Sequence, residues 1–281
     1  MTQFTNKEID LTGTTALVTG GGRGLGRGFA RALASSGANV VITSRSAEQL
    51  KETVDLISEE GGQALSVPAD VADPKQVEDV IANAIDKFGD IHLLVNNAGI
   101  PGPMQPLWNS EPEAWWKTLE INLRGPMLFT ASLLPTMMAL NRGRIINVSS
   151  GVISGPGTYL GAYGAAKAAL TWWTNCLANE LEHYAIPIFA YAPGLVRTAM
   201  VDYAEHSSEV DQRIQNRFRT NLEEGRDTPI NVTVEKFMLL ASGKLDQLTG
   251  RFIQVGDDFE WLIAHTDEII TEDLHTLRVR Q

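Results

Sequence analysis

The sequence has almost no cysteine and no long apolar run. Among its 281 residues Cys176 is the single cysteine, so an intrachain disulfide is excluded and a reducing compartment fits. The longest apolar candidate, around residues 127–140, is flanked by Pro126 and broken by Pro135, and it falls short of the roughly 18 residues of a membrane-spanning helix. The N-terminal MTQFTNKEID lacks the apolar stretch of a signal peptide. We therefore expect a cytoplasmic protein without a membrane span.

Positive charge is also scarce. Lys and Arg number 23 against 34 Asp and Glu, for a formal net charge of −11. This balance argues against a nucleic-acid or anionic-membrane surface, which needs clustered basic residues, but leaves room for a local basic pocket. The histidines are scattered without the spacing of metal ligands, so we expect no metal site. They are His92, His183, His206, His265 and His275.

Short apolar runs alternate with longer segments of helical period. We expect strands at 15–19, 40–43, 64–67, 93–96, 144–148, 186–191 and 251–255, and helices at 24–35, 47–60 and 74–88. Runs such as VVIT and RIINV are almost continuously apolar, which is typical of parallel strands covered on both faces. The alternation predicts an α/β fold, a doubly wound, mostly parallel seven-stranded sheet with helices on both faces in a single domain.

A glycine-rich turn, TGGGRGLG at 19–26, joins the first expected strand to the first expected helix. Glycines let a phosphate approach the backbone, and the N–H groups and dipole at a helix N-terminus favour an anion. Gly20, Gly24 and Gly26 have the spacing G-x-x-x-G-x-G rather than G-x-G-x-x-G. We interpret the turn as a dinucleotide-binding site; the alternative is a tight turn that uses small residues for helix packing.

The second expected strand ends without a carboxylate, in Ile42-Thr43-Ser44-Arg45. In dinucleotide-binding folds an acidic residue here accepts hydrogen bonds from the ribose 2′-OH of NAD and would repel a 2′-phosphate. Ser44 and Arg45 can instead donate hydrogen bonds to that phosphate, and Arg23 adds a second positive charge. This pattern favours NADP(H) over NAD(H). The alternative for Arg45 is a solvated loop residue.

Tyr163 and Lys167 are four residues apart, so on a helix they share one face. An ammonium group beside a phenol favours the phenolate, so we expect Lys167 to lower the pKa of Tyr163. Ser150 follows the fifth expected strand and can return its hydroxyl to the same sheet edge. A lone Tyr-x-x-x-Lys is commonly a surface pair; together with the glycine turn it indicates a proton-transfer site.

The ordered set of motifs resembles the short-chain dehydrogenase/reductase family, in its branch of single-domain enzymes. The motifs are TGGGRGLG at 19–26, Asp70-Val71, NNAG at 96–99, Asn122, Ser150, YGAAK at 163–167 and PGLVRT at 193–198. The resemblance covers roughly residues 10–256 and implies a Rossmann-type fold. It implies Asn122, Ser150, Tyr163 and Lys167 as the catalytic residues.

The resemblance also implies a role for each site residue. Tyr163 would donate the proton in reduction, Lys167 would bind the nicotinamide ribose and Ser150 the carbonyl oxygen, while Asn122 would hold a relay water. The glycine turn would line the pyrophosphate and the adenosine ribose, Asp70-Val71 the adenine, 97–99 the adenosine half and 193–198 the nicotinamide. With the two residues at the second strand, the expected cofactor site comprises Gly20, Arg23, Gly24, Leu25, Gly26, Ser44, Arg45, Asp70, Val71, Asn97, Ala98, Gly99, Tyr163, Lys167, Pro193, Gly194, Val196 and Thr198.

Two stretches depart from the family pattern. The polar stretch 200–227 is too long for an ordinary connection and is either a lid or a disordered loop. The chain continues for 25 residues after Gly256 instead of closing its last strand with Asp-Gly-Gly. We therefore expect a catalytic domain at 1–256, with a substrate lid at 195–230, and an extension at 257–281 packed on the same or a neighbouring subunit.

The surroundings of the site are less determined by the sequence. PGPMQPLW at 101–108 is expected to line the substrate cleft, where Met104, Leu107 and Trp108 would favour an apolar substrate. The pairs Trp115-Trp116 and Trp172-Trp173 are interpreted as interface or core rather than substrate-stacking residues. The resemblance implies a homodimer or homotetramer that meets through helices around 111–138 and 158–183.

Three functions therefore compete. The first is an NADP(H)-dependent oxidoreductase that interconverts a ketone or aldehyde with an alcohol, using Tyr163 as general acid/base. The second is an NAD(H)-dependent alcohol dehydrogenase. The third is a non-catalytic NADP(H)-binding sensor or scaffold, a role that such folds also serve. The complete set of four catalytic side chains argues against the third.

Overall fold

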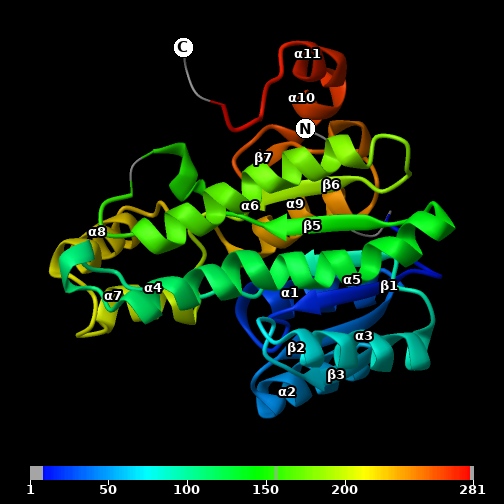
Figure 1. The fold of residues 1–281 in the computed structure, drawn as a ribbon, viewed down its shortest axis with the longest axis horizontal. Helices are drawn as coiled ribbons and strands as arrows, with labels where there is room; N and C mark the ends of the chain where they lie inside the picture. The colour runs from blue at the N-terminus through cyan, green and yellow to red at the C-terminus, as the bar shows by residue number, and fades with distance from the viewer. Residues whose placement is uncertain (1–8, 156, 279–281) are drawn as a thin grey trace.

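A seven-stranded parallel sheet organises the computed structural model, which describes residues 9–155 and 157–278 (Figure 1). The strand order is β3-β2-β1-β4-β5-β6-β7, and every pairing is parallel. The predicted doubly wound α/β fold is confirmed. The strands are β1 Thr15–Thr19, β2 Asn39–Ser44, β3 Gln63–Pro68, β4 Leu93–Asn96, β5 Arg144–Val148, β6 Ile188–Ala192 and β7 Phe252–Gln254.

The central strands are buried on both faces, as their apolar runs predicted. Successive side chains of β1 and β2 point to opposite sides, so Leu17 and Val41 join one hydrophobic core while Val18 and Ile42 join the other. All four side chains have no exposed surface. A one-residue shift in register would exchange the two sets, so burial on both faces fixes the pairing Leu17 to Val41.

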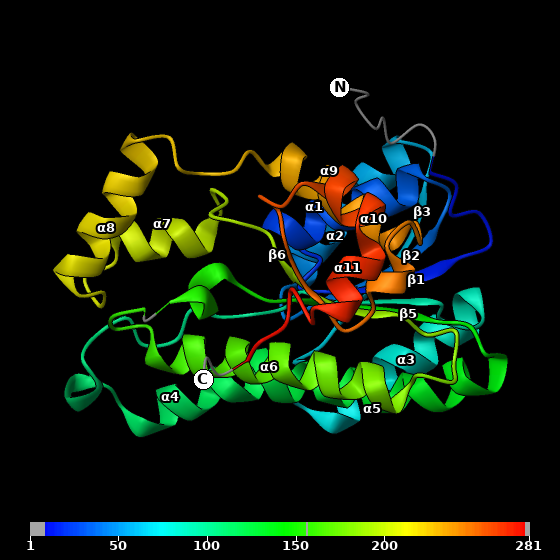
Figure 2. The same ribbon diagram turned by 90° about the horizontal axis from the view of Figure 1, so that it is seen from above.

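Helices form a layer on each side of the sheet (Figure 2). The hydrophobic cores place α1, α2 and α9 on one face and α3, α5 and α6 on the other. The helices are α1 Gly24–Ser35, α2 Ala47–Glu59, α3 Pro74–Phe88, α4 Pro112–Leu119, α5 Gly125–Leu140, α6 Gly161–Glu180, α7 Ala199–His206, α8 Gln212–Glu223, α9 Ile230–Ala241, α10 Phe259–Ala264 and α11 Thr266–Thr271.

Local capping explains where several helices begin. Asp73 accepts hydrogen bonds from the N–H groups of Lys75 and Gln76, and Pro74 is the first residue of α3. Ser46 accepts from the N–H of Gln49 and begins α2. Because these signals are local, the sequence placed α3 at its observed bounds and α2 within one residue.

The stretch 200–227 is not a disordered loop, because it contains α7 and α8. Figure 2 shows both helices displaced to one end of the sheet, the same end at which α4 lies. Val210 and Ile214 are buried there in a small hydrophobic cluster with Met104 and Leu160. The loop interpretation failed because the apolar residues that dock α8 are few and its other faces are polar.

The residues after Gly256 pack on this chain. Phe259, Leu262 and Ile269 are buried in the core that also contains α1 and α9. The N–H of Phe252 in β7 donates to the carbonyl of His275, so the tail runs beside the edge strand. The division of the chain at residue 256 stays a prediction; residues 1–8 of the expected domain and 279–281 of the expected extension lie outside the described residues. Over the described part, none of the helices combines the length and apolar character needed to span a bilayer.

Candidate active site

A cavity of about 720 Å³ lies at the carboxyl edge of the sheet, beside the neighbouring strands β1 and β4. The helices that follow these two strands pack on opposite faces of the sheet. This point of reversed strand order is where open α/β sheets bind ligands. Every catalytic and cofactor residue expected from the sequence lines this one cavity. They are Gly20, Arg23, Gly24, Leu25, Gly26, Ser44, Arg45, Asp70, Val71, Asn97, Ala98, Gly99, Asn122, Ser150, Tyr163, Lys167, Pro193, Gly194, Val196 and Thr198.

The glycine turn is folded so tightly that a side chain does not fit at Gly20 or Gly26. Gly20 has φ +68°, and a Cβ there would lie 2.8 Å from the Asn97 amide nitrogen. A Cβ on Gly26 would overlap the carbonyl oxygen of Gly20. Asn97 donates to the carbonyl of Thr19 at 2.8 Å, so its side chain holds the turn in place. The glycines thus bring bare backbone to the cavity wall, which a phosphate needs.

Positive charge and open N–H groups face the cavity around this turn. The first residue before α1, Arg23, makes no side-chain cap, and the first turn of α1 holds no carboxylate. Arg23 and Arg45 are exposed and form no ion pair within residues 9–155 and 157–278. This is one place in a protein of net charge −11 where basic groups lack acidic partners.

The end of β2 carries a buried hydroxyl without a partner in the described part of the chain. The hydroxyl oxygen of Ser44 is buried and has no hydrogen-bond partner among the described residues. A Cβ on Gly22 would lie 3.0 Å from that oxygen, so Gly22 leaves the space beside it free of a side chain. An unsatisfied buried hydroxyl, a cradle without side chains and two unpaired arginines are features that a phosphate-bearing ligand can use. The residues present therefore fit a nicotinamide dinucleotide.

Ser149 and Ser150 are adjacent but point to different places. The Ser149 hydroxyl is buried and lies 2.6 Å from the Thr171 hydroxyl, so it is used inside the protein. Ser150 begins the short helix η4 (Gly151–Ser154), and its side chain lines the cavity and lowers the pKa of Tyr163. Ser150 is therefore the serine that can act together with the tyrosine.

Tyr163 and Lys167 lie one turn apart on α6, with the lysine Nζ 5.8 Å from the centre of the tyrosine ring. Burial raises the pKa of Tyr163 above its ordinary 10.0, and the side chain of Ser150 lowers it by less. The net direction of this pKa shift is therefore opposite to the depression expected from Lys167. The phenol consequently keeps its proton at neutral pH, which suits a proton donor.

Lys167 is nearly inaccessible, with 3% of its surface exposed. Its Nζ donates to the carbonyl of Val148 at 2.7 Å, at the end of β5. Burial lowers the pKa of Lys167 to about 8, because the interior disfavours its charged form. The lysine therefore changes charge within the range of an ordinary pH profile.

Asn122 occupies a π-helical segment, η3 (Glu120–Arg124), between α4 and α5. Its Nδ2 donates to the carbonyls of Ile100 and Thr118 at 2.9 and 2.8 Å, which fixes the side chain. Its Oδ1 is buried without a partner in the described chain, and a Cβ on Gly99 would come within 2.6 Å of that atom. Single π-turns inside helices often occur at functional sites because they release backbone groups from the helix.

The loop after β6 closes the cavity opposite the glycine turn. Thr233 donates to the carbonyl of Pro193 at 2.8 Å and holds the loop. Gly194 has φ +81°, a conformation that favours glycine. Thr198 precedes α7 without capping it, and its methyl group would lie 3.4 Å from a Cβ on Gly24. A second uncapped helix N-terminus thus meets the glycine turn across the cavity.

Sequence reasoning placed some side chains wrongly. Met104 does line the cavity, but Leu107 and Trp108 are 70% and 82% exposed and do not. They belong to the short helix η2 (Leu107–Asn109), which turns them outward. None of the four paired tryptophans lines the cavity.

Sequence reasoning also missed part of the wall. Gln49 from α2, and Arg217, Phe218 and Asn221 from α8, line the cavity without having been singled out. The sequence feature that could have pointed to the α8 residues is a group of three arginines without an acid between Gln212 and Leu222.

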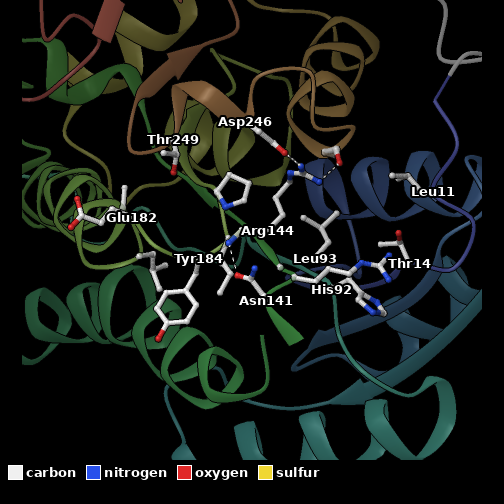
Figure 3. Close-up of a pocket in the computed structure, with 18 residues that line it drawn as sticks. Leu11, Thr14, His92, Leu93, Asn141, Arg144, Glu182, Tyr184, Asp246 and Thr249 are labelled. Atoms are coloured by element: carbon white, nitrogen blue, oxygen red, sulfur yellow. Dashed lines mark hydrogen bonds and ion pairs between the residues drawn. The ribbon is translucent and has the colours of Figure 1, made fainter. Parts of the chain in front are cut away.

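A second cavity, of about 470 Å³, lies at the opposite edge of the sheet (Figure 3). Arg144 points to Asp246, which accepts from it at 2.6 Å, while His92 lies at the start of β4. None of the expected catalytic or cofactor residues lines this cavity. Across the described ranges, no group of three or more His, Cys, Asp or Glu side chains is placed to hold a metal ion.

Comparisons with known proteins agree on one family. The family described as short chain dehydrogenase matches residues 14–209. A short chain dehydrogenase of Pseudocercospora fijiensis is 31% identical over 269 residues, covering 92% of this chain and 85% of that protein. The 3-oxoacyl-acyl-carrier-protein reductase FabG of Staphylococcus aureus is 34% identical over 244 residues, covering 86% of this chain and 96% of that protein. A solved structure of an actinorhodin polyketide ketoreductase variant with NADPH has a TM-score of 0.79 at 28% identity, covering 86% of this chain and 95% of that one.

Proposed function

Because this chain belongs to the short-chain dehydrogenase family of oxidoreductases, we propose that it transfers a hydride between NADP(H) and a carbonyl/alcohol pair, with Tyr163 as general acid/base. The observation that carries the proposal is that Ser150, Tyr163 and buried Lys167 line the same cavity as the glycine turn. Ketoreductases among the similar proteins support the reductive direction.

Each side chain has a role that its environment supports. A bound nicotinamide dinucleotide supplies the hydride in reduction and accepts it in oxidation. The hydroxyls of Ser150 and Tyr163 hold the substrate oxygen, and Tyr163 gives its proton to the alkoxide as charge develops there. Lys167 would bind the ribose hydroxyls of a bound nicotinamide cofactor, and Asn122 would hold a water that relays protons. The glycine turn, Arg23, Arg45, Asp70-Val71 and residues 97–99 and 193–198 hold the rest of the cofactor.

Cofactor choice depends on Ser44 and Arg45, and titration of the purified protein tests it. We expect NADPH to bind more tightly than NADH. Binding is monitored by the quenching of tryptophan fluorescence and by the rise of nicotinamide emission. Arg45→Ala is expected to raise the Kd for NADPH about 10- to 100-fold, because it removes a charged hydrogen bond to the 2′-phosphate. The Kd for NADH should change by less than about twofold, since NADH has no such phosphate.

Two variants make this titration specific. Arg142→Ala removes the same charge at the far edge of the sheet and is expected to leave both dissociation constants unchanged. Ser44→Asp places a carboxylate at the end of β2 and is expected to reverse the preference toward NADH. A wild-type preference for NADH would reject the NADP(H) assignment and favour an NAD(H)-dependent alcohol dehydrogenase. Failure to bind either dinucleotide would reject the function itself.

We also propose that the chain assembles as a homodimer or homotetramer through α4, α5 and α6. Trp116 on α4 and Trp172 on α6 are 62% and 50% exposed, and exposed aromatic side chains of this size are enriched in interfaces. Trp116→Glu is expected to shift the species seen by analytical ultracentrifugation toward monomer. Trp108→Glu makes the same change outside these helices and should leave assembly unchanged. The cytoplasmic location expected from the sequence stays a prediction.

A further inference from the structure

Helix α8 brings an arginine to the cavity that the cofactor site does not account for. Arg217, Phe218 and Asn221 line the cavity from this helix. Arg217 and Asn221 are one turn apart, so an amide and a guanidinium share the face that meets the cavity. The helix has three arginines and no acid between Gln212 and Leu222, although the whole chain has a net charge of −11.

The contacts of α8 place Arg217 near the catalytic end of the cavity rather than near Ser44. One turn before Arg217, Arg213 donates to the Tyr159 hydroxyl at 2.7 Å, just ahead of the helix that carries Tyr163. The N–H of Asp211 donates to the carbonyl of Met104 at 2.9 Å. Helix α8 therefore covers the side of the cavity where the substrate oxygen would be held.

Apolar side chains surround this end of the cavity. Phe218 packs against a cluster that includes Met104 and Leu160, and all three line the cavity. Val152, from the segment after Ser150, packs against the same cluster and also lines the cavity. A substrate that occupies this space presents an apolar body to these side chains, and Arg217 lies beside that body.

Arg217 has no partner in the part of the chain that the structure describes, whereas Arg213 on the same helix and Arg197 near its end do. Arg213 binds Tyr159, and Arg197 pairs with Asp227 at 2.7 Å. The exposed side chain of Arg217 appears in no ion pair or hydrogen bond between described residues. A guanidinium that lines a cavity without a carboxylate is available to an anion of the ligand, which it can bind with two parallel hydrogen bonds.

We propose that Arg217, assisted by Asn221, determines specificity by binding an anionic group of the substrate. The substrate class is then a ketone with an apolar body and a carboxylate or phosphate at the end away from the carbonyl. The inference rests on the proposed carbonyl reduction. The cofactor phosphates are assigned instead to the glycine turn and to Arg23 and Arg45, which line the same cavity from β1, β2 and α1.

Matched substrates test this inference. With NADPH, kcat/KM is measured for methyl-ketone acids with two to six methylenes between carbonyl and carboxylate, for their methyl esters, and for the corresponding keto-alkyl phosphates. The acid or the phosphate of the best chain length is expected to exceed its ester at least about tenfold, and the better of the two identifies the anion. Arg217→Ala should lower kcat/KM for that anion about 10- to 100-fold, mainly through KM, and leave the ester unchanged.

Arg219→Ala is the matched control. Arg219 is on the same helix and has the same charge, but it does not line the cavity. It should leave kcat/KM for the anionic ketone within about twofold. Equal losses in the two variants would overturn the proposal, because they would show long-range attraction by the helix as a whole. Equal losses for acid and ester in Arg217→Ala would overturn it as well.

Two binding measurements separate this inference from the proposed function. Arg217→Ala is expected to leave the Kd for NADPH unchanged; an increase larger for NADPH than for the anionic ketone would assign Arg217 to the cofactor and overturn the proposal. Calorimetry of octanoate with the NADP⁺-loaded protein should show weaker binding to Arg217→Ala than to Arg219→Ala. If no ketone is reduced at all, the proposed function fails, and the octanoate measurement still decides whether Arg217 binds a carboxylate.

Discussion

Replacing Tyr163 with phenylalanine is expected to lower kcat for carbonyl reduction on the order of 10²- to 10⁴-fold. The phenol lies in the cavity with its pKa raised by burial, so it holds a proton at neutral pH. Phenylalanine keeps the ring and removes only the group that donates the proton. The measurement is NADPH consumption at saturating cofactor with a ketone that the wild type reduces.

Two controls show whether the loss of turnover in Tyr163→Phe is a loss of proton transfer or a structural defect. They are the Kd for NADPH and a comparison of alanine variants at Ser150 and Ser149. The Kd for NADPH of the Tyr163→Phe protein should stay within about twofold of wild type, because the lost hydroxyl faces the substrate oxygen. Ser150→Ala should also lower kcat, whereas Ser149→Ala should affect stability more than turnover, since the Ser149 hydroxyl bonds to Thr171 inside the protein. Undiminished turnover in Tyr163→Phe would reject Tyr163 as the acid.

The sequence was sufficient where the fold depends on local or periodic signals. The strands β1, β4 and β5 have the expected bounds, because apolar runs buried on both faces leave little freedom in their ends. The strands β2, β3, β6 and β7 differ by one or two residues at their ends, where hydrogen bonding to a neighbouring strand decides. The parallel sheet then brings the segments after β1, β4, β5 and β6 to one edge, which is why residues far apart in the chain line one cavity.

The sequence was insufficient where a side chain's direction depends on packing between distant segments. Leu107 and Trp108 are apolar and follow the NNAG motif, yet the turn of η2 exposes both. Arg217 is one of three similar arginines on α8, and only the docking of α8 on Met104 and Leu160 shows which of them meets the cavity. The pKa of Tyr163 was expected to be lowered by Lys167, but burial raises it. The spacing of four residues between the two side chains says nothing about how far the phenol is removed from water.

Lys167→Met is expected to remove activity and yet to raise the free energy of unfolding at pH 7. Burial lowers the pKa of Lys167 to about 8 from its ordinary 10.5, so folding works against protonation of this group. This difference costs the wild type about 3 kcal/mol below pH 8, and the cost fades as pH rises toward 10.5, where the unfolded chain also loses the proton. Methionine avoids the cost but also loses the hydrogen bond to Val148, worth about 1 kcal/mol. A net gain of about 2 kcal/mol is expected at pH 7.

Urea unfolding of the protein without cofactor at pH 7 and at pH 10 tests this stability effect. The advantage of Lys167→Met should be smaller at pH 10 than at pH 7. Lys87→Met makes the same chemical change at an exposed position and should alter stability by less than about 0.5 kcal/mol. A Lys167→Met protein that is less stable than wild type at pH 7 would show that the ammonium is satisfied where it lies. A more stable but inactive protein would mean that the buried lysine is retained for chemistry at the expense of stability.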